Sequence, residues 1–137
     1  MKNIAIILIC IGILFGCGRM IDDGCDGNST FFVKNESDKT LVFEIVSRYF
    51  NVKSDSIEVA TNKVIQIGEE GGTGYNPIPS NRYSKISVFT IVNGKKNLAF
   101  TLNPVKDEKW MVERKKYDDS YCESRIYTLI VTQKDIP

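Results

Sequence analysis

The chain has 137 residues, 42% of them hydrophobic, with 18 basic and 17 acidic side chains and no histidine. This composition excludes an intrinsically disordered chain, and the near-zero charge gives no long-range attraction to nucleic acid or anionic lipid. The lack of histidine removes the Ser-His-Asp and Cys-His catalytic arrangements and nearly all zinc and copper sites, so we expect a single non-enzymatic domain without a cofactor or metal.

The N-terminus is predicted to carry an export signal. Lys2 precedes an uncharged run over Asn3–Gly18, which is shorter than the roughly 20 residues of a membrane-spanning helix and is typical of a signal peptide. The run contains Leu14-Phe15-Gly16-Cys17, which resembles the lipobox of bacterial lipoproteins. The resemblance implies a signal peptide over 1–16, with diacylglycerol and a further acyl chain such as palmitate on Cys17. An uncleaved anchor and an unlipidated export signal remain alternatives.

The cysteines agree with export. Cys10 leaves with the signal peptide and Cys17 takes the lipid, so Cys25 and Cys122 remain as an even pair in an oxidising compartment. We predict a Cys25–Cys122 disulfide, with two free thiols as the alternative. We expect the protein in the cell envelope, held by lipid on the outer membrane and facing either the periplasm or the cell surface.

Residues 17–29 are predicted to form a flexible tether, because acidic residues, glycines and Asn28 follow one another there. A loose calcium site is the alternative to a solvated leader, with four candidate ligands: Asp22, Asp23, Asp26 and Asn28. Residues 30–137 then form the folded domain.

The domain is predicted to consist of strands, without a convincing helix. The expected strands cover 30–33, 40–50, 56–60, 64–67, 84–92, 96–102, 110–112 and 125–132. In the second of them, alternation turns four side chains inward: Leu41, Phe43, Ile45 and Tyr49.

Turn residues separate these strands. Asn35–Lys39 is a polar turn whose short side chains bond their own backbone, and Asn93-Gly94 predicts a type I′ hairpin. Residues 68–81 hold several glycines, Pro77 and Pro79, and are predicted to lack regular structure. The whole pattern predicts an all-β, immunoglobulin-like β-sandwich of about 7–8 strands, with a small antiparallel β-barrel as the alternative.

Across nearly its whole mature length the chain resembles the small lipoproteins of unknown function that are common in the Bacteroidota. Besides the lipobox at Leu14–Cys17, the resemblance rests on the opening hairpin Phe31–Thr40, on the late Trp110 and on the closing segment Tyr127–Ile136. It implies an exported all-β domain and supplies no catalytic residues.

Three side chains are candidates for surface chemistry. Tyr75 lies in the glycine-rich segment and is a candidate contact residue, because loops carry binding more often than strands do. Trp110 is expected in the core, with an exposed ring that stacks on a sugar as the alternative. Ser56, within Asp55-Ser56-Ile57, resembles an acceptor of protein O-glycosylation in Bacteroidota envelope proteins.

The sequence therefore predicts a membrane-anchored, exported lipoprotein that acts as a non-enzymatic binding or envelope-interaction module. Its partner is expected to be a protein or a glycan, and not nucleic acid. The alternative function is a periplasmic inhibitor or immunity protein that blocks a hydrolase.

Overall fold

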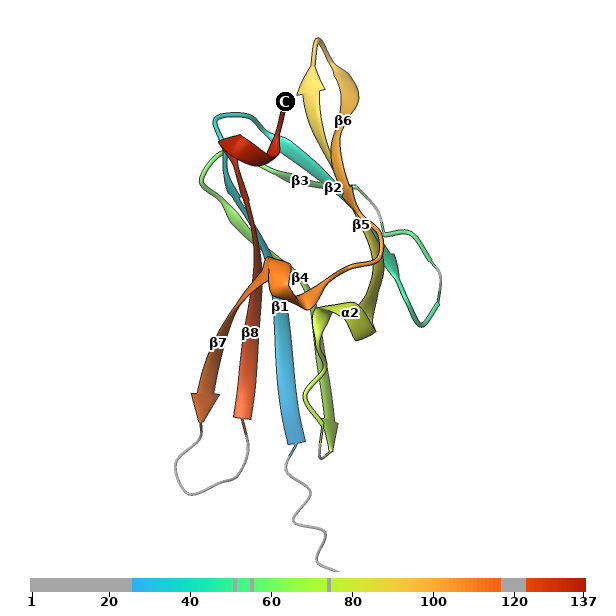
Figure 1. The fold of residues 1–137 in the computed structure, drawn as a ribbon, viewed down its shortest axis with the longest axis vertical. Coiled ribbons are helices and arrows are strands. Elements are labelled where there is room, and N and C mark those ends of the chain that lie inside the picture. Colours follow the sequence, from blue (N-terminus) through green and yellow to red (C-terminus); the bar gives the residue numbers. More distant parts are fainter. Residues whose placement is uncertain (1–25, 51, 55, 74, 117–122) are drawn as a thin grey trace, which may run out of the picture.

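The computed structural model describes residues 26–50, 52–54, 56–73, 75–116 and 123–137. The strands are β1 (Asp26–Glu36), β2 (Leu41–Ser47), β3 (Ile57–Val59), β4 (Val64–Thr73), β5 (Tyr83–Val92), β6 (Lys95–Leu102), β7 (Trp110–Lys116) and β8 (Glu123–Thr132) (Figure 1). The short helices are α2 (Pro79–Arg82) and the two 3₁₀ turns η1 (Asp107–Lys109) and η2 (Gln133–Asp135). Each of the eight predicted strands coincides with an observed strand, although β2 ends at Ser47 and β3 covers only Ile57–Val59.

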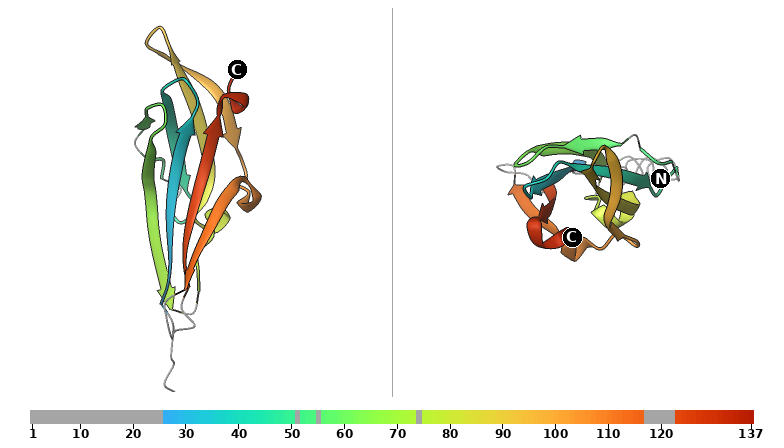
Figure 2. Two further views of the ribbon diagram at one scale, coloured as in Figure 1. Left: turned by 90° about the vertical axis from the view of Figure 1, so that its left-hand side faces the viewer. Right: turned by 90° about the horizontal axis from the view of Figure 1, so that it is seen from above.

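The strands form two four-stranded sheets, in the orders β4-β1-β8-β7 and β3-β2-β5-β6. Neighbouring strands run antiparallel, except that β1 and β8 are parallel. The sheets face each other around a common core, as the view from above shows (Figure 2). This confirms the predicted all-β sandwich, and the described residues form two separate sheets rather than one closed sheet.

Aromatic rings fill the centre of the core. The Phe31 ring is fully buried and lies 5.4 Å from the Tyr83 ring at an interplanar angle of 82°. It also stacks on Tyr127, with the ring centroids 5.5 Å apart. The predicted inward positions of β2 are buried for Leu41, Phe43 and Ile45.

The prediction for Tyr49 is wrong, because β2 ends at Ser47 and Tyr49 is 54% exposed. The backbone N–H of Ser47 donates to the carbonyl of Val52 at 3.1 Å, which turns the chain away from the sheet. Tyr49 therefore lies in the loop that joins β2 to β3, here named the β2–β3 loop.

The prediction of an irregular segment over 68–81 is also wrong in part. β4 continues to Thr73, and α2 begins at Pro79, a residue whose fixed φ suits the first position of a helix. Paired with this extension, β1 begins at Asp26 rather than at Thr30. Pairing between the two strands outweighs the weak strand propensity of the glycines.

The segment after β4 explains two of those glycines. A Cβ atom on Gly72 would lie 2.8 Å from Cδ1 of Tyr75, and one on Gly27 would lie 2.6 Å from the carbonyl oxygen of Tyr75. The chain therefore folds back closely over β1 and β4, where a side chain would block it.

The hairpin prediction is confirmed. Asn93 and Gly94 alone join β5 to β6, with φ values of 51° and 73°, as a type I′ turn requires. The β5–β6 hairpin extends past the other strands at one end of the molecule, whereas β1 begins at the opposite end (Figure 1).

Candidate functional site

Trp110 belongs to the core. It begins β7, is only 6% exposed, and its ring stacks on Tyr83 at a centroid distance of 6.2 Å and an angle of 11°. It also meets Phe31 edge-on at 6.4 Å. The expected core position is confirmed, and the alternative of an exposed sugar-stacking ring is wrong.

Ser56 is exposed just before β3, and its hydroxyl belongs to a charged network. It accepts a hydrogen bond from Nζ of Lys96 at 2.6 Å and donates to Glu44 at 3.4 Å. Lys53 and Lys96 form ion pairs with Glu44 at 2.8 and 3.2 Å, and the hydrogen bond from Lys53 is the main cause of the lowered pKa of Glu44. Ser56 is thus at the surface, and its glycosylation stays a prediction.

The cysteine predictions lie outside the described residues, which include none of Cys17, Cys25 and Cys122. Lipidation and the disulfide therefore stay predictions. Within the described residues no helix is long and apolar enough to cross a membrane, and no group of three or more His, Cys, Asp or Glu side chains could hold a metal ion. Asn28, a candidate calcium ligand, donates through Nδ2 to Glu69 at 2.7 Å, and its Oδ1 is buried without a hydrogen-bond partner.

Tyr75 connects two segments that are distant in sequence. It follows β4, is 41% exposed, and its hydroxyl lies 3.3 Å from that of Tyr49 in the β2–β3 loop. This hydrogen bond, helped by desolvation and by the charge of Glu70, raises the pKa of Tyr75 to about 12. Tyr75 thus faces solvent, as the prediction of a contact residue requires.

A groove lies between the β2–β3 loop and the strands next to it, at the side of the sandwich where β3 is only three residues long. Its volume is about 270 Å³, and we name it the Arg82 groove. β2, the β2–β3 loop, β3, β4, α2 and β5 contribute its lining: Ile45, Ser47, Phe50, Val52, Ser54, Ile57, Ile67, Arg82 and Tyr83.

Three polar atoms of this lining are buried without a hydrogen-bond partner: Oγ of Ser47, Nε of Arg82 and the hydroxyl of Tyr83. Each such atom costs about 1–3 kcal/mol. Burial raises the pKa of Tyr83 to about 12, although the nearby Arg82 guanidinium opposes the shift. The Arg82 charge therefore acts on the Tyr83 hydroxyl, although the distances and angles between the two side chains are not those of a hydrogen bond.

Arg82 is held in place by its neighbours. Its Nη1 forms an ion pair with Oε2 of Glu70 at 3.1 Å, and both side chains are half-buried. Its carbonyl accepts a hydrogen bond from the N–H of Arg48 at 2.9 Å. Arg82 thus ties α2 both to β4 and to the β2–β3 loop, and its Nε has no hydrogen-bond partner.

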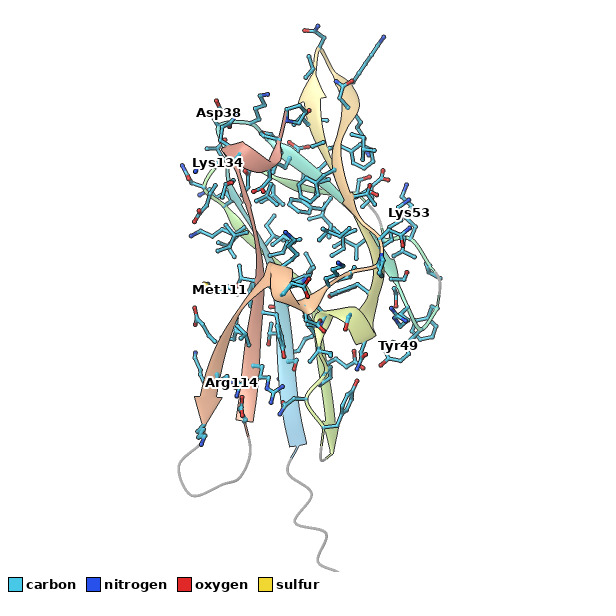
Figure 3. All side chains as sticks on the ribbon, viewed as in Figure 1. Asp38, Tyr49, Lys53, Met111, Arg114 and Lys134 are labelled. Atoms are coloured by element: carbon cyan, nitrogen blue, oxygen red, sulfur yellow. The ribbon has the colours of Figure 1, made fainter. Side chains whose placement is uncertain are left out.

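The edge of the groove carries exposed apolar side chains. Phe50 is 76% exposed and Val52 is 61% exposed, and Tyr49, next to Phe50 in the chain, is hydrogen-bonded to Tyr75. We name these four residues the apolar rim. Figure 3 shows the β2–β3 loop, which carries the labelled Tyr49 and Lys53, projecting from the side of the molecule.

A second groove, of about 230 Å³, lies between β6 and β8. Its lining is Phe100, Leu102, Lys109, Leu129, Ile130 and Asp135. None of the buried polar atoms that lack a partner in the described residues belongs to this lining. The Arg82 groove is therefore the stronger candidate for a ligand site.

Sequence reasoning found only one of the four rim residues, Tyr75, and none of the three unpartnered polar groups. A signal for Phe50 and Val52 is present in the sequence, because apolar residues continue there beyond the point where the alternation of β2 ends. Apolar side chains in a polar loop are typical of a contact surface.

No protein-family model matches this chain, and no curated protein matches it in sequence. Its function must therefore be argued from the geometry of the rim and the groove.

Proposed function

We propose that this protein is an exported lipoprotein, anchored on the outer membrane through Cys17, that acts as a non-enzymatic binding module for a protein or glycan of the cell envelope. The observation that carries the binding role is the apolar rim next to a groove with unpartnered polar atoms. The uncharged N-terminal run and the resemblance of Leu14–Cys17 to a lipobox support the anchor.

The rim has the composition of a contact surface. Aromatic residues are enriched in interfaces, and exposed apolar side chains that gather in one place mark interaction sites. Burial of a ring such as Phe50 by a partner would contribute about 1.5–3 kcal/mol.

The described residues of the β2–β3 loop are also held by hydrogen bonds before any partner arrives. The backbone N–H of Ser54 donates to the carbonyl of Ile45 at 2.7 Å, and that of Ser47 donates to Val52 at 3.1 Å. The Tyr49–Tyr75 hydrogen bond adds a third attachment. A fixed loop loses little conformational freedom on binding.

The test compares two double variants by quantitative binding to a glycan array and to purified envelope proteins. Phe50→Ala with Val52→Ala removes half of the rim, and Val92→Ala with Leu98→Ala removes exposed apolar side chains of the β5–β6 hairpin as the control. We expect the rim variant to lose binding and the hairpin variant to keep it. Equal binding by both would refute the proposed surface.

The anchor is tested separately. Cys17→Ala should abolish the incorporation of labelled fatty acid, and persistent labelling would contradict the lipobox. Protease treatment of intact cells then shows which way the domain faces: cleavage from outside means surface display, whereas protection until the outer membrane is opened means a periplasmic position.

The inhibitor or immunity function is a second candidate, because the projecting β2–β3 loop with Phe50 at its surface could enter the active-site cleft of a hydrolase. This function predicts inhibition of a muramidase or toxin that Phe50→Ala abolishes. A hydrolase whose rate is the same with and without the protein would count against it.

A further inference from the structure

We infer that the Arg82 groove binds the carboxyl-terminal residue of a peptide chain, with the terminal carboxylate on Arg82 and an apolar last side chain against the isoleucines. The inference rests on the proposed binding function and names the chemistry of its protein partner.

The polar residues of the lining suit a carboxylate. Nε of Arg82 can only donate a hydrogen bond, and the hydroxyls of Ser47 and Tyr83 can also donate. All three atoms are buried without partners, and Tyr83 is only 3% exposed. A carboxylate accepts several hydrogen bonds, and those from a guanidinium are the strong, charge-assisted kind.

The charges around the groove favour a ligand with a single negative charge. Glu70 already forms an ion pair with Nη1 of Arg82, so the two charges of the pair cancel. One further negative charge can share the guanidinium, whereas a doubly charged phosphate group would face Glu70 without a second cation in the lining.

The apolar part of the groove has room for one side chain. Its wall includes Ile45, Ile57 and Ile67, and its volume of about 270 Å³ lies just below the roughly 300–1,000 Å³ of sites for drug-sized molecules. A Leu or Phe side chain suits this size. The preceding residues of the peptide would leave across Phe50 and Val52, which line the groove and are exposed.

The test is calorimetric titration of the full chain, in a non-ionic detergent, with N-acetyl-leucine, N-acetyl-leucinamide and octanoate. We expect the acid to bind at least about tenfold more tightly than the amide, because the amide lacks the charge that Arg82 recognises. Equal affinity for acid and amide would refute the carboxylate, and octanoate binding more tightly than N-acetyl-leucine would refute the peptide in favour of a fatty acid.

Two variants assign the effect to this groove. Arg82→Gln should reduce the affinity for N-acetyl-leucine by about tenfold or more, and Glu70→Gln should increase it, because Glu70 no longer competes for the guanidinium. Lys109→Gln, in the groove between β6 and β8, is the matched control. Thermal unfolding of each variant verifies the fold, and a folded Arg82→Gln protein with unchanged affinity would refute the site.

The Glu70→Gln variant keeps the inference testable even if Arg82→Gln does not fold, since a gain of affinity cannot come from unfolding. If no probe binds but the rim variant still loses its partner, the peptide terminus is wrong and the binding function stands. If neither the probes nor the rim variant shows an effect, both proposals fail.

Discussion

Replacement of Asn35 by Ala should destabilise the domain more than any surface change. Asn35 lies at the end of β1 and is fully buried. Its Nδ2 donates to the carbonyls of Lys39 at 2.8 Å and Val59 at 2.9 Å, and its Oδ1 accepts from the N–H and the hydroxyl of Ser37 at 2.9 and 2.7 Å. One amide thus joins the β1–β2 turn to β3.

The size of the effect follows from the groups left behind. Once Oδ1 is removed, the single hydroxyl proton of Ser37 can bond the Lys39 carbonyl, 3.1 Å away, so the loss falls on the Val59 carbonyl and the Ser37 N–H. A buried group without a partner costs about 1–3 kcal/mol. We therefore expect Asn35→Ala to lower the free energy of unfolding by about 2–4 kcal/mol, a large part of the usual 5–15 kcal/mol or so.

Urea denaturation followed by circular dichroism measures this difference. Asn35→Asp should be at least as harmful, because a carboxylate cannot donate to the two carbonyls. Asn97→Ala is the control: Asn97 is exposed and makes only a 3.4 Å hydrogen bond, so its change should stay within about 0.5 kcal/mol. An Asn35→Ala protein as stable as this control would refute the reasoning.

Three further changes test the core and the hairpin. Gly68→Ala should lower the free energy of unfolding by about 1–3 kcal/mol, because its Cβ would overlap the Tyr83 hydroxyl. In a Tyr83→Phe background the same change should cost much less. A double-mutant cycle that shows no coupling between the two positions would contradict the contact. The pKa of Tyr83 is raised to about 12 in the folded state, so its contribution to stability is present below about pH 10 and is lost as the pH rises towards 12. The free energy of unfolding, measured by urea titration between pH 9 and pH 12, should therefore fall less steeply in Tyr83→Phe than in the unchanged protein. Gly94→Ala should cost about 1 kcal/mol by thermal unfolding, because Gly94 has a φ of 73° with nothing near its Cβ position.

Local patterns predicted the parts of the fold that depend on neighbours in sequence. Alternation placed Leu41, Phe43 and Ile45 in the core, and the demands of a type I′ turn placed the β5–β6 hairpin at Asn93-Gly94. The polar turn after β1 is likewise confirmed, since Oδ1 of Asn35 accepts from the N–H of Ser37.

The other features of the fold and of the candidate site depend on contacts between segments that are far apart in the sequence. Nothing local shows that β4 runs on through Gly71 and Gly72, because that extension exists through pairing with β1. The parallel pairing joins β1 and β8, the first and the last of the described strands. The Arg82 groove draws its lining from several elements, so no single stretch of sequence could reveal it.

A buried polar atom without a partner lowers stability but can serve a ligand, and Ser47→Ala tests whether Ser47 does both. Its buried Oγ has no hydrogen bond, so Ser47→Ala removes a polar atom without breaking an interaction. Stability should therefore stay the same or rise by up to about 1 kcal/mol, as measured by urea denaturation. If the hydroxyl instead serves the terminal carboxylate of a bound peptide, the same variant should bind N-acetyl-leucine less tightly. A protein that loses stability on this change would mean that the hydroxyl supports the fold, and the groove would then lose one of its three donors.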